Sequence, residues 1–165
     1  MKIKKHLLFL FSLTIFIFSF TNCNKHKNNF PVVIDFSTKE ARDEFSKLEL
    51  DSLYINLLNT VTNEQEGDTL YQRWLDFNSQ LADTVKANNF NWGTKDSSVI
   101  IWNRVYCAEN GKIEYYLYNI VDSTISQDQK VAYGAFIKTK LPLLKYNVQR
   151  EYKYAQCGSW RHYTY

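Results

Sequence analysis

The 165-residue chain is long enough for one domain, and its 45% hydrophobic and 16% aromatic content can build a buried core. Five glycines and two prolines exclude collagen-like and low-complexity architectures. The net charge of +3 comes from the first residues. Without Lys2, Lys4 and Lys5, 17 of the 20 basic residues remain against 17 acidic ones. This balance argues against a nucleic-acid partner, because phosphate binding needs an excess of cations.

The amino terminus has the pattern of an export signal. Met1–His6 is basic, and the apolar run Leu7–Phe20 is shorter than the roughly 20 residues that span a bilayer. Phe20-Thr21-Asn22-Cys23 follows, and it resembles the lipobox of bacterial lipoproteins. The resemblance implies that residues 1–22 are a signal peptide and that Cys23 is diacylated. The alternative is an ordinary signal peptide or an uncleaved anchor with an incidental cysteine.

Lipidation would place the protein outside the cytoplasm, anchored to a membrane. More than one acyl chain gives stable attachment, whereas a single chain is marginal. Residues 23–34 would form a polar tether, whose cations either contact anionic lipid or belong to a soluble linker. We expect attachment to the outer membrane of a diderm bacterium, facing either the periplasm or the outside.

The first half of the mature chain has a helical pattern. Ser37-Thr38-Lys39-Glu40 predicts a capped helix start, and a break near Asp51-Ser52 leaves open whether one or two helices follow. Asp68 is expected to cap a further helix over residues 69–88. Its apolar stripe has helical spacing and comprises Leu70, Trp74, Phe77, Leu81 and Val85.

The second half predicts two strands, a helix and a last strand. Residues 99–106 and 112–121 are rich in β-branched and aromatic residues, and Asn110-Gly111 between them favours a hairpin. A helix over about 127–141 follows, and residues 146–156 alternate aromatic with polar. We therefore predict one α+β domain over residues 35–165. It would have two or three amino-terminal helices followed by a ββαβ unit with a small antiparallel sheet.

Residues 99–157 are similar to the TonB carboxy-terminal fold of periplasmic energy transducers in element order and in the turn Asn110-Gly111-Lys112-Ile113. The resemblance implies that the last strand lies at a sheet edge and accepts a partner strand. The membrane helix and proline-rich spacer of transducers have no counterpart here, so energy transduction is not implied. The candidate partner-binding residues of that edge strand are Tyr146, Val148, Arg150, Tyr152 and Tyr154.

Residues that could carry catalysis are scarce. After the tether the chain has one histidine, His162, so the available nucleophile–base pair is Cys107 or Cys157 with His162, without a third orienting group. Cys107 and Cys157 would form a disulfide in an oxidising compartment, or else remain two free thiols. Glu64, Glu66 and Asp68 crowd one turn without calcium-loop spacing. We expect no enzyme activity, metal or cofactor.

One aromatic–cation surface is a candidate for binding. Trp102, Arg104 and Tyr106, with Tyr116 and Tyr118 opposite, would form either a binding face or the face on which helix 69–88 packs. The sequence favours a non-enzymatic module that binds an unknown envelope protein, and the alternative is a lipoprotein that binds a small ligand or glycan. A bare edge strand would support the first function, and an apolar pocket lined by Trp or Tyr the second.

Overall fold

The computed structural model describes residues 31–164, so the predicted signal peptide and the predicted lipidation site Cys23 lie outside the described residues. Five strands form one mixed sheet in the order β1-β4-β3-β5-β2. The strands are β1 (Val32–Asp35), β2 (Ile55–Asn56), β3 (Ser98–Cys107), β4 (Ile113–Ile120) and β5 (Tyr154–Tyr163). The helices are α1 (Lys39–Ser46), α2 (Leu50–Leu53), η1 (Leu57–Thr60), α3 (Glu64–Ala87), α4 (Gln127–Lys140) and η2 (Leu141–Leu143).

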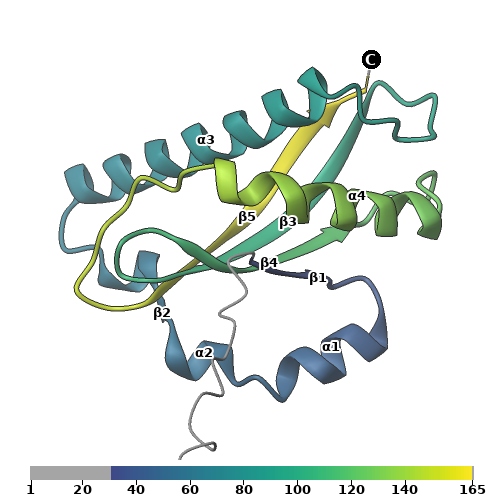
Figure 1. Cartoon of the computed structure of the whole chain (residues 1–165). Helices are drawn as coiled ribbons and strands as arrows, with labels where there is room; N and C mark the ends of the chain where they lie inside the picture. Colours follow the sequence, from purple (N-terminus) through teal and green to yellow (C-terminus); the bar gives the residue numbers. More distant parts are fainter. Residues whose placement is uncertain (1–30, 165) are drawn as a thin grey trace, which may run out of the picture.

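The sheet lies between two layers of helix (Figure 1). The larger core joins α3 and α4 to one face of the sheet through residues such as Phe77, Leu81 and Ile137. The smaller core joins Leu50 and Tyr54, in and just after α2, to Tyr106 and neighbouring residues on the other face. Successive residues of a strand point to opposite faces, so each strand contributes to both cores.

Central strands β3 and β4 form an antiparallel hairpin, while β1 and β2 add in parallel at the two edges. The α+β class is as predicted. The sheet differs from the prediction of a small antiparallel one, because it has five strands and mixes parallel with antiparallel pairs. Strands also lie before and after the first helices, so the predicted succession of helices and then a ββαβ unit does not describe the chain. Residues 32–34, assigned from sequence to the tether, belong to β1.

Each longer helix begins at a side-chain cap. Thr38, rather than Ser37, accepts the amide of Ala41 at the start of α1. Asn63 caps α3, which begins several residues before the predicted cap Asp68, and Ser126 caps α4. Two helices form, but the break lies before Leu50, where the backbone of Glu49 is left-handed, and not near Asp51-Ser52, which lies inside α2.

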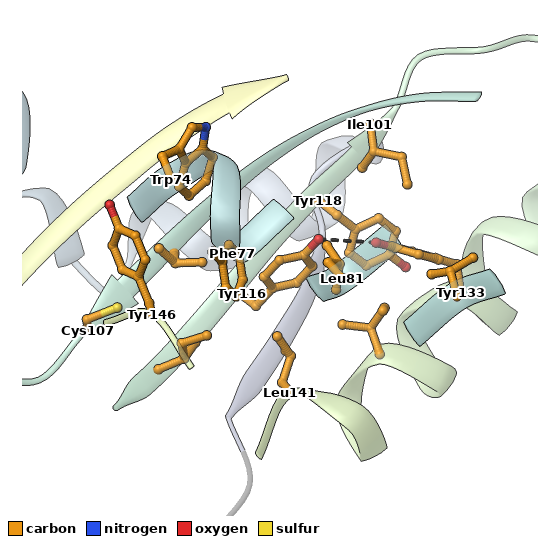
Figure 2. Packing of buried hydrophobic residues seen from close by; sticks show 14 of the residues in the cluster. Trp74, Phe77, Leu81, Ile101, Cys107, Tyr116, Tyr118, Tyr133, Leu141 and Tyr146 are labelled. Atoms are coloured by element: carbon orange, nitrogen blue, oxygen red, sulfur yellow. Dashed lines mark hydrogen bonds between the residues drawn. The ribbon is translucent and has the colours of Figure 1, made fainter. Parts of the chain in front are cut away.

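The core under α3 contains packed aromatic rings (Figure 2), and it also contains a buried polar network. Asn103 on β3 donates from its amide nitrogen to Asn78 on α3 at 2.9 Å, and Asn78 donates to the carbonyl of Trp74 at 2.8 Å. The hydroxyls of Tyr116 and Tyr133 lie 3.2 Å apart. Hydrogen bonds of this kind offset the cost of burying polar groups, and they fix how α3 and α4 sit on the sheet.

The turn between β3 and β4 depends on Gly111, which has φ +81°. Asn110 does not share the positive φ that the Asn-Gly pair predicts; its side chain instead accepts the amide of Lys112. A Cβ atom at Gly111 would lie 2.6 Å from the carbonyl oxygen of Tyr146 and 2.7 Å from that of Val148. The turn is therefore packed tightly against the segment that leads to β5.

Replacing Gly111 with alanine is expected to lower the free energy of unfolding by at least about 2 kcal/mol, because positive φ and a clash with two carbonyl oxygens act together. Urea unfolding measures the loss. Gly67→Ala in α3 is the matched control, since its Cβ would meet only Val61 at 3.4 Å, and it should be neutral or stabilising. Equal stability of the two variants would contradict this account of the turn.

Candidate functional site

The segment proposed from sequence as an edge strand is not one. Tyr146, Val148, Arg150 and Tyr152 lie between η2 and β5, and Tyr154 is the first residue of β5. The strand β5 itself pairs with β3 along its whole length and with β2 at Tyr154 and Ala155. The prediction that Tyr146–Gln156 forms a partner-binding edge is therefore wrong.

The aromatic alternation of this segment has a packing role. Tyr146 and Val148 are buried, and the ring of Tyr146 contacts the rings of Trp74 and Phe77 on α3. Arg150 forms an ion pair with Glu66 at 3.0 Å and donates its backbone amide to the carbonyl of Glu109. Burial thus alternates with period two, but no strand forms here: the amide of Val148 donates to the carbonyl of Tyr146 two residues before it, which is the hydrogen bond of a tight turn.

The open edge lies further along, in the second half of β5. The amide of Ile55 donates to the carbonyl of Lys153, so odd-numbered residues of β5 direct their backbone groups toward β2. The pairing with β2 ends at Ala155. Among residues 31–164, no strand covers the outward backbone groups of Ser159, Arg161 and Tyr163. A run of unpaired amides and carbonyls is the feature to which an extended segment can add.

Side chains along this edge differ between the two faces. Gly158 and His162 face α3 and α4: a Cβ at Gly158 would lie 2.7 Å from the indole nitrogen of Trp74, and the His162 ring contacts Tyr133. Ser159, Arg161 and Tyr163 are exposed on the other face. Arg161 donates to the hydroxyl of Ser98 at 3.0 Å. The outer face of this edge therefore carries polar and cationic side chains, and its inner face packs against α3 and α4.

A pocket of about 490 Å³ opens where α3 and β5 both end. It lies between the last turn of α3, the loop that follows, and the end of β5. The lining residues are Val85, Lys86, Ala87, Asn89, Phe90, Asn91, Trp92, Thr94, Tyr163 and Thr164. The lining is mixed: the rings of Phe90, Trp92 and Tyr163 alternate with polar side chains such as those of Asn89, Asn91 and Thr94. It was not anticipated from sequence, because Phe90 and Trp92 lie in a stretch that predicts only a helix end.

Cys107 and Cys157 are both free, so the predicted disulfide is absent. Cys107 pairs across the sheet with Tyr154, and Cys157 pairs with Arg104. The two cysteines are therefore offset by three residues along the sheet, about 10 Å, and they point to opposite faces. A disulfide requires Cα atoms within about 7 Å, so this geometry excludes one. Burial also raises the pKa of the Cys107 thiol to about 12, which keeps it protonated.

His162 does not form a nucleophile–base pair with either cysteine. Its ring is 1% exposed and packs against Trp92 and Tyr133, on the sheet face opposite to Cys157 and at the far end of the strand from Cys107. Neither ring nitrogen has a hydrogen-bond partner. Burial lowers the pKa of His162 to about 4, so the imidazole is neutral near pH 7. The candidate catalytic pair is not assembled.

The aromatic–cation surface is a packing face, but not for the helix expected. Arg104 pairs with Asp51 of α2 at 2.7 Å, and the hydroxyl of Tyr106 donates to the same carboxylate at 2.7 Å. Trp102 contacts Phe36 near α1. Helix α3 lies on the opposite face of the sheet. Tyr116 and Tyr118 also point to that opposite face, because a bulge at Tyr106–Cys107 shifts the register of the hairpin.

A second ionic cluster joins three elements at the other end of the sheet. Glu114 of β4 accepts from Tyr54 at 2.6 Å and from Lys153 at 2.8 Å. Burial alone would raise the pKa of Glu114, but the hydrogen bonds from Lys153 and Tyr54 outweigh it and lower the pKa. The carboxylate of Glu114 therefore joins two segments through its two donors: the residue between α2 and β2, and the start of β5.

The acidic residues Glu64, Glu66 and Asp68 belong to the first turns of α3 and do not form a cation site. The carboxylate of Glu66 accepts hydrogen bonds from the backbone amide and the hydroxyl of Thr62, just before the N-cap residue Asn63. These bonds lower the pKa of Glu66. Within the described part of the chain, no group of three His, Cys, Asp or Glu side chains could hold a metal ion. None of the helices over residues 31–164 is long and apolar enough to cross a membrane.

Comparison with known proteins identifies no relative. No family model, no curated protein and no solved structure matches the chain.

Acid should destabilise the protein through His162. Its folded pKa of about 4 lies below the ordinary value of 6.5, so the unfolded state binds more protons between these values. Stability is therefore complete above pH 6.5 and falls by about 3 kcal/mol as the pH drops toward 4.

Urea unfolding between pH 7 and pH 5 should show about 2 kcal/mol of this loss, in a range above that in which carboxylates titrate. The His162→Phe variant keeps a buried ring without a titrating group, so its stability should change little over the same range. Parallel losses in the variant and the original protein would show that His162 does not carry the pH dependence.

Proposed function

We propose that the protein is a lipid-anchored module of the cell envelope of a diderm bacterium that binds another envelope protein without catalysis. The lipobox-like sequence ending at Cys23 supports the anchor. The open second half of β5 is the single observation that carries the binding function, because its backbone groups face outward over several residues. A segment of the partner would add there as a strand.

The succession of β3, β4, α4 and β5 also supports this proposal. It keeps the element order that residues 99–157 share with the TonB carboxy-terminal fold, which we propose as the ββαβ unit of this domain. The interacting residues differ from those expected from sequence. Cys157–Tyr163 replaces Tyr146–Tyr154 as the binding edge, since the earlier segment packs against α3.

A ligand- or glycan-binding function is the second candidate. The pocket between α3 and the end of β5 has the volume of a small-molecule site and contains Phe90, Trp92 and Tyr163. Aromatic faces of this kind stack on sugars. The open edge favours protein binding over ligand binding, because a row of backbone donors and acceptors pairs with an extended peptide and not with a small ligand.

The anchor is tested by Cys23→Ser. The variant should leave the membrane fraction and take no acyl label, because Cys23 is the sole attachment point in this proposal. The original protein, fractionated in parallel, provides the control. A Cys23→Ser protein that stays on the membrane and still takes label would overturn the assignment.

The edge is tested with proline, which removes one backbone amide. The amide of Ser159 faces outward, so Ser159→Pro should lower the free energy of unfolding by less than about 1 kcal/mol. It should also abolish the crosslinks to envelope proteins that form in cells. Ser159→Ala keeps the amide and should keep the crosslinks.

Trp160 supplies the contrasting position, because its amide faces β3. Trp160→Pro should destabilise the protein by about 3 kcal/mol more than Trp160→Ala, since it also removes a bond of the sheet. Unchanged crosslinks in a folded Ser159→Pro protein would exclude strand addition at this edge.

A further inference from the structure

The chain enters the domain at one end of the sheet, through Val32. Strands β1, β2, β4 and β5 all begin at this end, and the antiparallel β3 stops there. The first residues of the two edge strands, Val32 and Ile55, pair there with Tyr115 of β4 and Tyr154 of β5. Figure 1 shows the β3–β4 turn and the start of β5 at the left of the view, away from the end of β5. An attachment at Cys23 therefore reaches the domain at this end, which we call the anchor end.

The lipid proposed at Cys23 would hold the anchor end close to a membrane. Val32 is the ninth residue after Cys23, so at most about 32 Å of chain joins them. Strand β5 has ten residues and runs about 30 Å from the anchor end to Tyr163. The open half of β5 thus lies at the end of the sheet remote from Val32, where a partner can reach it.

Three exposed aliphatic side chains are grouped near a hollow at the anchor end. Val32 is 47% exposed, Leu53 62% and Ile55 46%. Val32 and Tyr54 line the same open pocket, whose volume is about 540 Å³, and Leu53 and Ile55 flank Tyr54 in the chain. Exposed aliphatic groups gathered at one site indicate a surface that contacts another molecule or a membrane.

The charges around this hollow do not keep it away from anionic lipid. Its lining contains two cations and two acids, Lys112, Lys153, Glu109 and Glu114, so their charges balance. Lys153 and Glu114 also form an ion pair at 2.8 Å. The chain between Cys23 and Val32 adds Lys25 and Lys27, each worth roughly 1 kcal/mol of attraction beside an anionic membrane surface.

We propose that the surface formed by Val32, Leu53 and Ile55 rests on the bilayer that holds the lipid of Cys23. The three aliphatic side chains enter the boundary between the headgroups and the acyl chains. Lipid is the occupant of this surface because the short connection to Cys23 keeps the two at a high effective concentration. This inference rests on the proposed lipidation of Cys23, and it adds the orientation in which the open half of β5 points away from the membrane.

Fluorescence quenching tests this orientation on the lipidated mature protein in vesicles of phosphatidylethanolamine and phosphatidylglycerol that contain nitroxide-labelled lipid. Leu53→Cys and Ile55→Cys each supply a thiol for an environment-sensitive dye, in a protein whose half-buried thiol is removed by Cys157→Ser. Cys107 is buried and its thiol has a pKa of about 12, so it stays unlabelled. Each dye should lose at least about half of its emission, because the surface lies at the depth of the quencher.

Val121→Cys and Val131→Cys are the matched controls, because these valines are 65% and 57% exposed but lie away from the hollow. Val121 follows the end of β4 that is remote from the anchor end, and Val131 belongs to α4, on the other face of the sheet. A dye at either position should lose less than about a tenth of its emission, since it stays in water.

The outcomes separate this inference from the anchor on which it rests. Equal quenching at all four positions, or none at positions 53 and 55, in a protein that takes acyl label would overturn the orientation and leave the anchor standing. A protein that takes no acyl label would overturn the anchor and this inference with it. A dye at position 53 that is unquenched in vesicles but shielded from an aqueous quencher in cells would mean that another protein covers this surface, and lipid would be the wrong occupant.

Discussion

The seating of α3 on the sheet is the contact on which the rest of the structure depends. Gly158 leaves room for the indole of Trp74, and the amide pair of Asn78 and Asn103 fixes where the helix lies along β3. Disturbing either contact is costly. A Cβ at Gly158 would press against the buried indole of Trp74. Loss of one amide of the Asn78–Asn103 pair would leave the other buried without a hydrogen-bond partner. The apolar stripe of α3 packs into the larger core, and these two contacts determine its position.

The open edge follows from the same arrangement. The chain leaves β2 after two residues and enters η1, whose Leu57 is fully buried in the α3 core. η1 still packs against β5, but strand pairing along this edge stops at Ala155. The end of α3 then leads into the loop with Phe90 and Trp92, which covers His162 and borders the pocket. Edge, pocket and buried histidine are thus consequences of where one helix begins and ends.

Much of this fold could be predicted from sequence, and the failures have physical causes. The α3 stripe and the β3–β4 hairpin are present because helical and strand periodicity are strong in those stretches. The strand β5 was expected over residues 146–156, since Cys157-Gly158 interrupts the pattern there. Gly158 is instead an interior strand residue that accommodates Trp74. Packing between elements distant in sequence decides this, and local pattern does not contain that information. The parallel pairing of β1 with β4 and of β2 with β5 was missed for the same reason.

Amide hydrogen exchange along β5 tests the central claim most directly. If the second half of β5 is an open edge, protection should alternate: the amides of Gly158, Trp160 and His162, which face β3, should exchange slowly, while those of Ser159, Arg161 and Tyr163 should exchange rapidly. Uniform protection of all six amides would mean that another part of the protein covers this edge, and the account would be wrong.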